Sequence, residues 1–123
     1  MNDRRMRFFS GITAMVVGGS LAVHGTQAEA QTMQATSYSA NQADAGRALY
    51  PRLCAPCHGA ALEGGEAGPA LRGQTFMNKW REKPFAELFE QTRRTMPVTQ
   101  PAGLPREQYE LLLAYMMASN GIA

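Results

Sequence analysis

The stretch Cys54-Ala55-Pro56-Cys57-His58 decides the fold. It places two thiols three positions apart and follows them at once with an imidazole, which is the attachment signature of a c-type haem. Each cysteine sulfur can add across one vinyl group of the haem to form a thioether, and the adjacent histidine can bind the iron. The sequence therefore predicts one haem c, attached through Cys54 and Cys57, with His58 as the proximal ligand.

Two cysteines in an exported chain can also form a disulfide, a redox-active dithiol or part of a zinc site. The pair is too closely spaced to cross-link distant parts of a fold, and no βαβ pattern of the thioredoxin kind surrounds it. A zinc site needs more ligands, and His58 is the only histidine after residue 30. A redox-active dithiol remains the alternative. Because no second copy of the motif occurs, the prediction is one haem per chain.

The N-terminus has the pattern of an export signal. Three arginines stand among the first seven residues, an apolar stretch over 8–23 is interrupted by glycines, and Ala28-Glu29-Ala30 offers small residues for cleavage. The stretch is short for a bilayer span. We expect a secretory signal peptide over 1–30, a periplasmic mature protein, and no stable membrane span after cleavage. An uncleaved membrane anchor is the alternative.

The chain has 123 residues, with 12 basic and 10 acidic side chains. From residue 31 onward nine basic and eight acidic residues remain, so the mature protein carries a formal charge of about +1. This balance predicts no nucleic-acid partner and weak long-range steering of charged partners. A solvated surface is preferred over a basic docking patch for the cluster Lys79, Arg81, Lys83, Arg93 and Arg94.

The first half of the mature chain combines a tether, a helix and a loop. Residues 31–40 are polar and without periodicity, which predicts a flexible tether. A helix is expected from near Asn41, capped by that residue, through Tyr50, with a kink or a short new turn at Pro51. The glycine-rich stretch 59–73 is expected to be a loop.

The second half shows two helical patterns. Residues 75–80 are expected to be a short connection, 84–94 a helix with one apolar face, and 95–104 an extended, proline-containing loop. A final helix is expected from Pro105 to about residue 120, with a broad apolar face formed by Tyr109, Leu112, Leu113, Tyr115 and Met116. No segment alternates like a strand, so the predicted fold is all-α.

The sixth iron ligand is expected to be a methionine, because no second histidine is present in the mature chain. The candidates are Met33, Met77, Met96, Met116 and Met117. Met96 is preferred, since it lies 38 residues after His58 in a loop that Pro97 stiffens. Met77 comes next and an open distal position third. Met116 and Met117 are interpreted as core-filling residues.

Four positions outside the motif extend the pattern. Gly46 and Tyr50 lie eight and four residues before the first cysteine, and Leu112 and Tyr115 lie on the predicted final helix. With the motif, they resemble the class I c-type cytochromes, most closely the small mono-haem cytochromes and cytochrome domains that partner bacterial quinoprotein dehydrogenases. The resemblance implies a cytochrome c domain over 41–123. It also implies N- and C-terminal helices that cross, with a middle helix and loops wrapped around one haem.

The resemblance also implies roles for single residues. In the segment 68–71, the carbonyl of Pro69 corresponds to one that accepts a hydrogen bond from the proximal histidine, here His58. Trp80 resembles a tryptophan whose indole N–H reaches a haem propionate. Met96 lies where the family has its axial methionine. The expected haem-binding set is thus Cys54, Cys57, His58, Pro69, Trp80 and Met96, with His58 and Met96 on the iron.

The expected function is one-electron transfer in the periplasm rather than catalysis. By resemblance, a quinoprotein dehydrogenase is the expected donor, and a terminal oxidase or another cytochrome is the expected acceptor. The alternatives are a haem-based sensor or peroxidase-like enzyme with an open iron position, and a dithiol oxidoreductase. Electrons are expected to leave at an exposed haem edge near Cys57 and Gly59.

Overall fold

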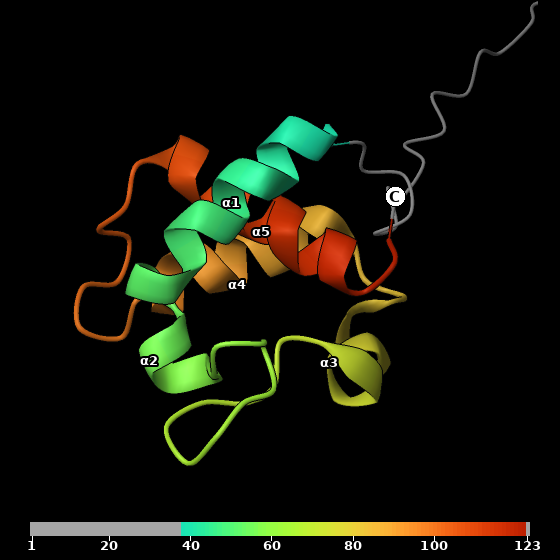
Figure 1. The fold of residues 1–123 in the computed structure, drawn as a ribbon, viewed down its shortest axis with the longest axis horizontal. Helices are drawn as coiled ribbons and strands as arrows, with labels where there is room; N and C mark the ends of the chain where they lie inside the picture. The colour runs from blue at the N-terminus through green and yellow to red at the C-terminus, as the bar shows by residue number, and fades with distance from the viewer. Residues whose placement is uncertain (1–37, 123) are drawn as a thin grey trace, which may run out of the picture.

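The computed structural model describes residues 38–122, which form five helices (Figure 1). They are α1 (Ala40–Leu53), α2 (Ala55–His58), α3 (Gly73–Trp80), α4 (Phe85–Thr95) and α5 (Arg106–Ser119). No β-strand occurs in this part of the chain, so the all-α prediction is confirmed. Within the same residues, no helix has the length and apolar character that a bilayer crossing requires. The predicted signal peptide, 1–30, and most of the predicted tether lie outside the described residues.

Helix α1 begins one residue earlier than predicted, and its cap is Ser39 rather than Asn41. The Ser39 hydroxyl accepts a hydrogen bond from the Gln42 amide at 3.2 Å, and the Ser39 amide donates to the Gln42 side chain at 2.8 Å. This reciprocal pair satisfies two helix-end donors, which Asn41 alone would not do. The hydroxyl of the preceding Tyr38 donates a hydrogen bond to the Ile122 carbonyl, which joins the start of α1 to the segment after α5.

Of the two alternatives predicted at Pro51, a kink or a short new turn, the new turn is wrong, because α1 continues through Pro51 to Leu53. Pro51 lies in the last turn, where its missing amide removes a single helical hydrogen bond. The Cys54 amide still donates to the Tyr50 carbonyl at 2.9 Å. The new short helix, α2, starts after Cys54 and has a proline in its first turn, where an amide hydrogen is not needed.

Helices α1 and α5 pack closely at Gly46, as the resemblance implies. A Cβ atom on Gly46 would lie 1.9 Å from the Leu111 carbonyl oxygen and 3.0 Å from the Cβ of Tyr115. The rings of Tyr50 and Tyr115 meet edge to face with centroids 5.4 Å apart. Only glycine allows this separation, because any side chain would enter the opposite backbone.

Residues 73–80 form helix α3, so the prediction of a short connection over 75–80 is wrong. Phe76 and Trp80 lie one turn apart and are both buried. The first amide of the helix, Gly73 N–H, donates to the Asn120 side-chain oxygen at 2.8 Å. The helix start is thus satisfied by a residue 47 positions away, which local sequence cannot reveal.

The remaining elements follow the sequence pattern. Helix α4 buries Leu88 and Phe89 and exposes Glu87 and Glu90, as its apolar spacing predicts. Residues 59–72 contain no helix, so the loop predicted over 59–73 is confirmed except at Gly73, which begins α3. Figure 1 shows α2, this loop and α3 along the bottom of the view, below α1, α4 and α5. The space between these two groups is where the site lies.

Candidate cofactor site

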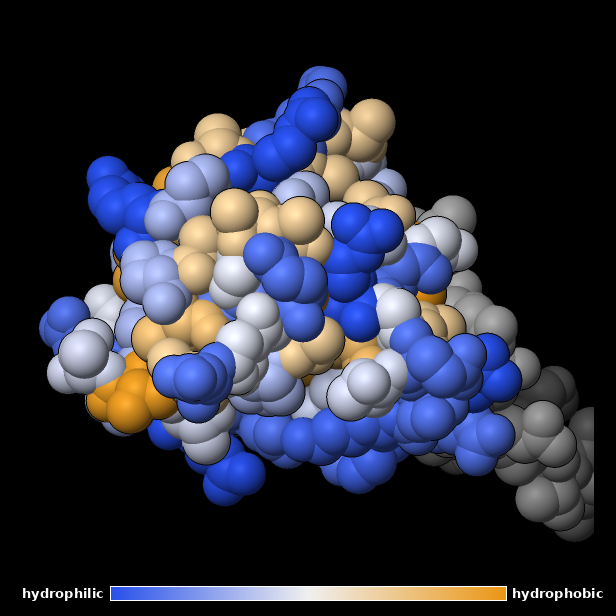
Figure 2. Space-filling model, turned by 60° about the horizontal axis from the view of Figure 1, so that its bottom comes forward, coloured by the Kyte–Doolittle hydropathy of each residue, from blue (hydrophilic) through white to orange (hydrophobic). Residues whose placement is uncertain are grey.

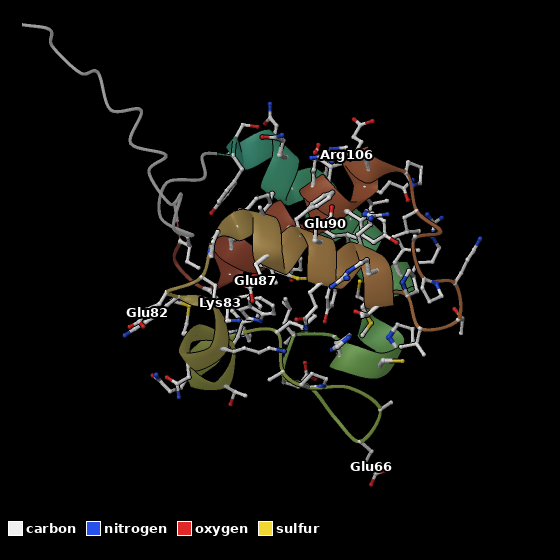
Figure 3. The ribbon with its side chains drawn as sticks, turned by 180° about the vertical axis from the view of Figure 1, so that it is seen from behind. Glu66, Glu82, Lys83, Glu87, Glu90 and Arg106 are labelled. Atoms are coloured by element: carbon white, nitrogen blue, oxygen red, sulfur yellow. The ribbon has the colours of Figure 1, made fainter. Side chains whose placement is uncertain are left out.

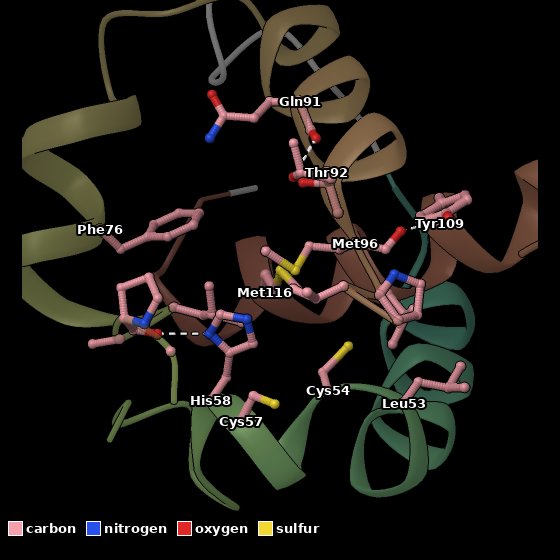
Figure 4. A pocket seen from close by; sticks show the side chains of 18 of the residues that line it. Leu53, Cys54, Cys57, His58, Phe76, Gln91, Thr92, Met96, Tyr109 and Met116 are labelled. Carbon is pink, nitrogen blue, oxygen red and sulfur yellow. Dashed lines mark hydrogen bonds between the residues drawn. The ribbon is translucent and has the colours of Figure 1, made fainter. Parts of the chain in front are cut away.

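A cavity of about 390 Å³ lies between the two groups of helices (Figure 4). Its volume is in the range of about 300–1,000 Å³ that small-molecule and cofactor sites occupy. The structure brings all of the predicted site residues to this one cavity: Cys54, Cys57, His58, Pro69, Trp80 and Met96 line it. Cys57 and His58 lie on α2, Pro69 lies in the glycine-rich loop, and Trp80 lies on α3. Cys54 follows the end of α1, and Met96 follows the end of α4.

The His58 ring is buried, with 7% of the residue exposed, and it is held by one hydrogen bond. Its Nδ1 atom lies 2.7 Å from the Pro69 carbonyl oxygen. Because a carbonyl only accepts, Nδ1 carries a proton that points to Pro69. The contact implied by the resemblance is present. It leaves Nε2 of His58 as a donor atom for a metal.

Gly68 packs directly under the same ring. A Cβ atom there would lie 2.9 Å from Nδ1 of His58 and 3.0 Å from the Cys57 carbonyl oxygen. Only a residue without a side chain lets the Pro69 carbonyl approach the ring this closely. Sequence reasoning quoted Gly68 as part of a segment but gave it no role. The available signal was its position directly before Pro69.

The two cysteines stand at the junction of α1 and α2, and neither forms a disulfide. Cys54 is partly buried, whereas Cys57 is exposed. Burial raises the pKa of the Cys54 thiol to about 11, and the neighbouring Cys57 adds to this shift. A buried thiol of this kind stays protonated at neutral pH.

The methionine candidates separate clearly. Met96 and Met116 line the cavity, whereas Met77 and Met117 are not among its lining residues, and Met33 lies outside the described part of the chain. Figure 4 shows Met96 entering the cavity from the end of α4, while His58 enters from α2 on the other side. Met116 is 4% exposed and lies on α5. Sequence reasoning did not predict that Met116 also faces the site.

The charged groups at the cavity are of one sign. Arg52 and Lys79 are among its lining residues, and no aspartate or glutamate is. The Lys79 ammonium lies 4.8 Å from the centroid of the Trp80 ring, which is itself buried. A largely apolar cavity with cations at its margin suits a flat apolar ligand that carries carboxylates.

The model of the family described as Cytochrome C oxidase, cbb3-type, subunit III matches residues 41–116, more than half of the chain. The chain belongs to this family. It is a c-type cytochrome, which makes it a haem-based electron carrier. No curated protein and no solved structure matches the chain.

The residues of this cytochrome fit a haem. The cavity has two thiols, an imidazole whose Nδ1 is held by Pro69 so that Nε2 is left as a donor atom, and a thioether from another element. When bound, a haem supplies an iron that alternates between Fe(II) and Fe(III). The residues that would hold it are Cys54 and Cys57 through their sulfurs, with His58 and Met96 as the donors for the iron.

Proposed function

We propose that the protein is a periplasmic one-electron carrier with a single haem c, attached through Cys54 and Cys57 and ligated by His58 and Met96. One observation carries the proposal. The imidazole of His58, from α2, and the thioether of Met96, from the end of α4, face one largely apolar cavity that both cysteines also line. A haem iron held by both His58 and Met96 would have no position left for a substrate.

The donor set also indicates a relatively high reduction potential. A thioether donates weakly to Fe(III), and an apolar environment disfavours the additional charge of the ferric state. The hydrogen bond from His58 to Pro69 acts in the opposite direction, because it makes the imidazole a stronger donor. We expect the methionine and the apolar walls to dominate.

The competing function is that of a haem-based sensor or peroxidase-like enzyme, which needs an open iron position. Replacement of Met96 by alanine separates the two. In the carrier, Met96→Ala abolishes the weak ferric absorption of the iron–sulfur bond near the red end of the spectrum. The matched controls Met77→Leu and Met116→Leu retain it. If the absorption survives in Met96→Ala, the assignment of Met96 is wrong.

A dithiol oxidoreductase is disfavoured by Cys54. Such enzymes need a thiolate at neutral pH, and they lower the pKa of the attacking cysteine. Here burial raises the pKa of the Cys54 thiol to about 11, which is the opposite direction from that of an attacking cysteine. A dithiol enzyme would purify colourless and react with thiol reagents, whereas the carrier keeps its haem stain on a denaturing gel.

The proposed partners are a quinoprotein dehydrogenase as donor and a terminal oxidase or another cytochrome as acceptor. The family description names an oxidase subunit, which supports an oxidase on the acceptor side. Cys57 is exposed, so a haem bound to its sulfur would have an edge near the surface. Figure 2, which brings the bottom of Figure 1 forward, shows apolar side chains among hydrophilic ones on this face. This pattern fits a small, transient contact.

The possible basic docking patch is weakened by ion pairs inside the chain (Figure 3). Lys83 pairs with Glu87, and Arg93 pairs with Glu90 at 2.9 Å. The Glu90 side chain has a lowered pKa because of its hydrogen bond to Arg93, so it stays ionised at neutral pH. Two of the five cations are therefore paired with acidic side chains three or four positions away, which supports a solvated surface.

Export is tested by fractionation of cells that express the full chain. We expect a haem-stained band in the periplasmic fraction, with a mature N-terminus at Gln31 by mass spectrometry. A haem-stained band that remains in the membrane fraction and keeps residues 1–30 would identify an uncleaved anchor instead.

A further inference from the structure

The segment that carries Met96 has little packing of its own. Residues 100–103, in the loop between α4 and α5, are all exposed. One backbone hydrogen bond ties the middle of the segment to α4, from the Ala102 amide to the Arg93 carbonyl at 2.8 Å. A donor on such a segment needs another anchor to stay at a fixed place in the cavity.

Tyr109, in the first turn of α5, supplies that anchor. Its hydroxyl donates to the Met96 carbonyl at 2.7 Å and accepts from the Leu104 amide at 3.4 Å (Figure 4). One hydroxyl thus contacts Met96 and Leu104, the two ends of the segment 96–104. The residue is 1% exposed, and its ring packs edge to face on Phe89 of α4, with centroids 6.4 Å apart.

Both backbone polar groups of Met96 are therefore held. Its amide donates to the Thr92 carbonyl of α4 at 2.8 Å, and its carbonyl accepts from Tyr109 of α5. Because both backbone groups are held, the position of the Met96 Cα atom and the direction of its side chain are restricted. The loss of the tyrosine hydroxyl would leave a half-buried carbonyl without its partner and release one of the two restraints.

We propose that Tyr109 is a positioning residue that holds Met96 as an iron ligand and so keeps the iron closed to outside ligands. This inference rests on the proposed ligation by His58 and Met96. Sequence reasoning placed Tyr109 only on the apolar face of the final helix. The structure adds a hydroxyl that is directed at the Met96 backbone.

The test compares Tyr109→Phe with Tyr115→Phe in the haem-loaded protein. Tyr115 lies on the same helix, and its hydroxyl makes no hydrogen bond within residues 38–122, so this variant controls for the chemical change. Imidazole is added, and the iron–sulfur absorption is followed. We expect half-loss in Tyr109→Phe at an imidazole concentration about three- to tenfold lower than in the wild type, with Tyr115→Phe unchanged. Equal values for all three proteins would overturn the proposal.

A second measurement separates positioning from general stability. On heating, Tyr109→Phe is expected to lose the iron–sulfur absorption at a lower temperature than it loses helical circular dichroism. If the two transitions fall together by the same amount, the hydroxyl only stabilises the fold and the positioning role is overturned. A wild-type protein without the absorption would overturn the proposed ligation itself, and the role of Tyr109 with it.

Discussion

At His58 a single contact determines which ring nitrogen is free. The Pro69 carbonyl fixes the proton on Nδ1, and it reaches the ring because Gly68 has no side chain. The arrangement joins the Pro69 carbonyl and Gly68, both in the loop, to the donor atom of His58 at the end of α2. The state of the candidate metal ligand is thus set by residues that never touch the metal.

Replacement of Gly68 by alanine should disturb this arrangement. The new Cβ would lie 2.9 Å from Nδ1, so the ring or the loop must move, and we expect a loss of about 1–3 kcal/mol in the free energy of unfolding. Chemical denaturation of the haem-loaded variant measures it. Gly65→Ala is the matched control, because its Cβ meets nothing within 4 Å. Similar unfolding midpoints for the two variants would contradict this account.

The residues of the site could be predicted from the sequence where they belong to a recognisable motif. The six predicted site residues were identified from the cysteine–histidine motif and the family resemblance, and they share one cavity. Tyr109 and Gly68 could not be assigned roles in the same way. Their roles depend on contacts with atoms 13 and about ten positions away, which hydrophobic periodicity does not encode.

At the scale of helices, the crossing of α1 and α5 depends on Gly46. Alanine at this position favours a helix by about 1 kcal/mol but would place its Cβ 1.9 Å from the Leu111 carbonyl oxygen. We expect Gly46→Ala to destabilise the fold by about 1–3 kcal/mol or more, because the clash is with backbone. Thermal unfolding measures the effect. The exposed Ala45→Gly reports the propensity term alone, and a Gly46→Ala protein as stable as the wild type would rule out the close crossing.

Helix α3 should depend on Asn120. Its side chain accepts from the Gly73 amide and donates to the Leu71 carbonyl at 3.0 Å, so Asn120→Ala removes a cap and a second contact. We expect a loss of about 1–2 kcal/mol and faster amide exchange confined to Gly73–Trp80. Asn78→Ala, on the exposed side of the same helix, is the control. Unchanged amide exchange over Gly73–Trp80 in Asn120→Ala would show that α3 is stable without this cap.

The sequence predicted those helices whose start and apolar face are encoded locally. Helices α4 and α5 follow an apolar period and start just after a proline, and both are local signals. Helix α3 is short, and its cap comes from the far end of the chain, so local pattern missed it. At α1 the competing cap Ser39 has a partner in Gln42, which a single-residue preference for Asn41 overlooked.

Over the described part of the molecule, ion pairs between residues three or four positions apart keep the surface field weak. We expect the electron-transfer rate with a candidate dehydrogenase or oxidase to change less than about threefold between about 0.01 and 0.1 M ionic strength. Glu87→Gln releases Lys83 from its pair and should steepen the salt dependence with an acidic partner. Stopped-flow kinetics measure both. A steep dependence in the unmodified protein would restore the basic docking patch.

A carrier of the proposed kind needs a closed, six-coordinate iron that both His58 and Met96 bind. The visible spectrum of the purified ferric protein, recorded before and after addition of cyanide, tests it most directly. We expect a low-spin spectrum with the weak iron–sulfur absorption and no immediate change on adding cyanide. A high-spin spectrum that shifts at once would show an open position and contradict the account in favour of a sensor or a peroxidase-like enzyme.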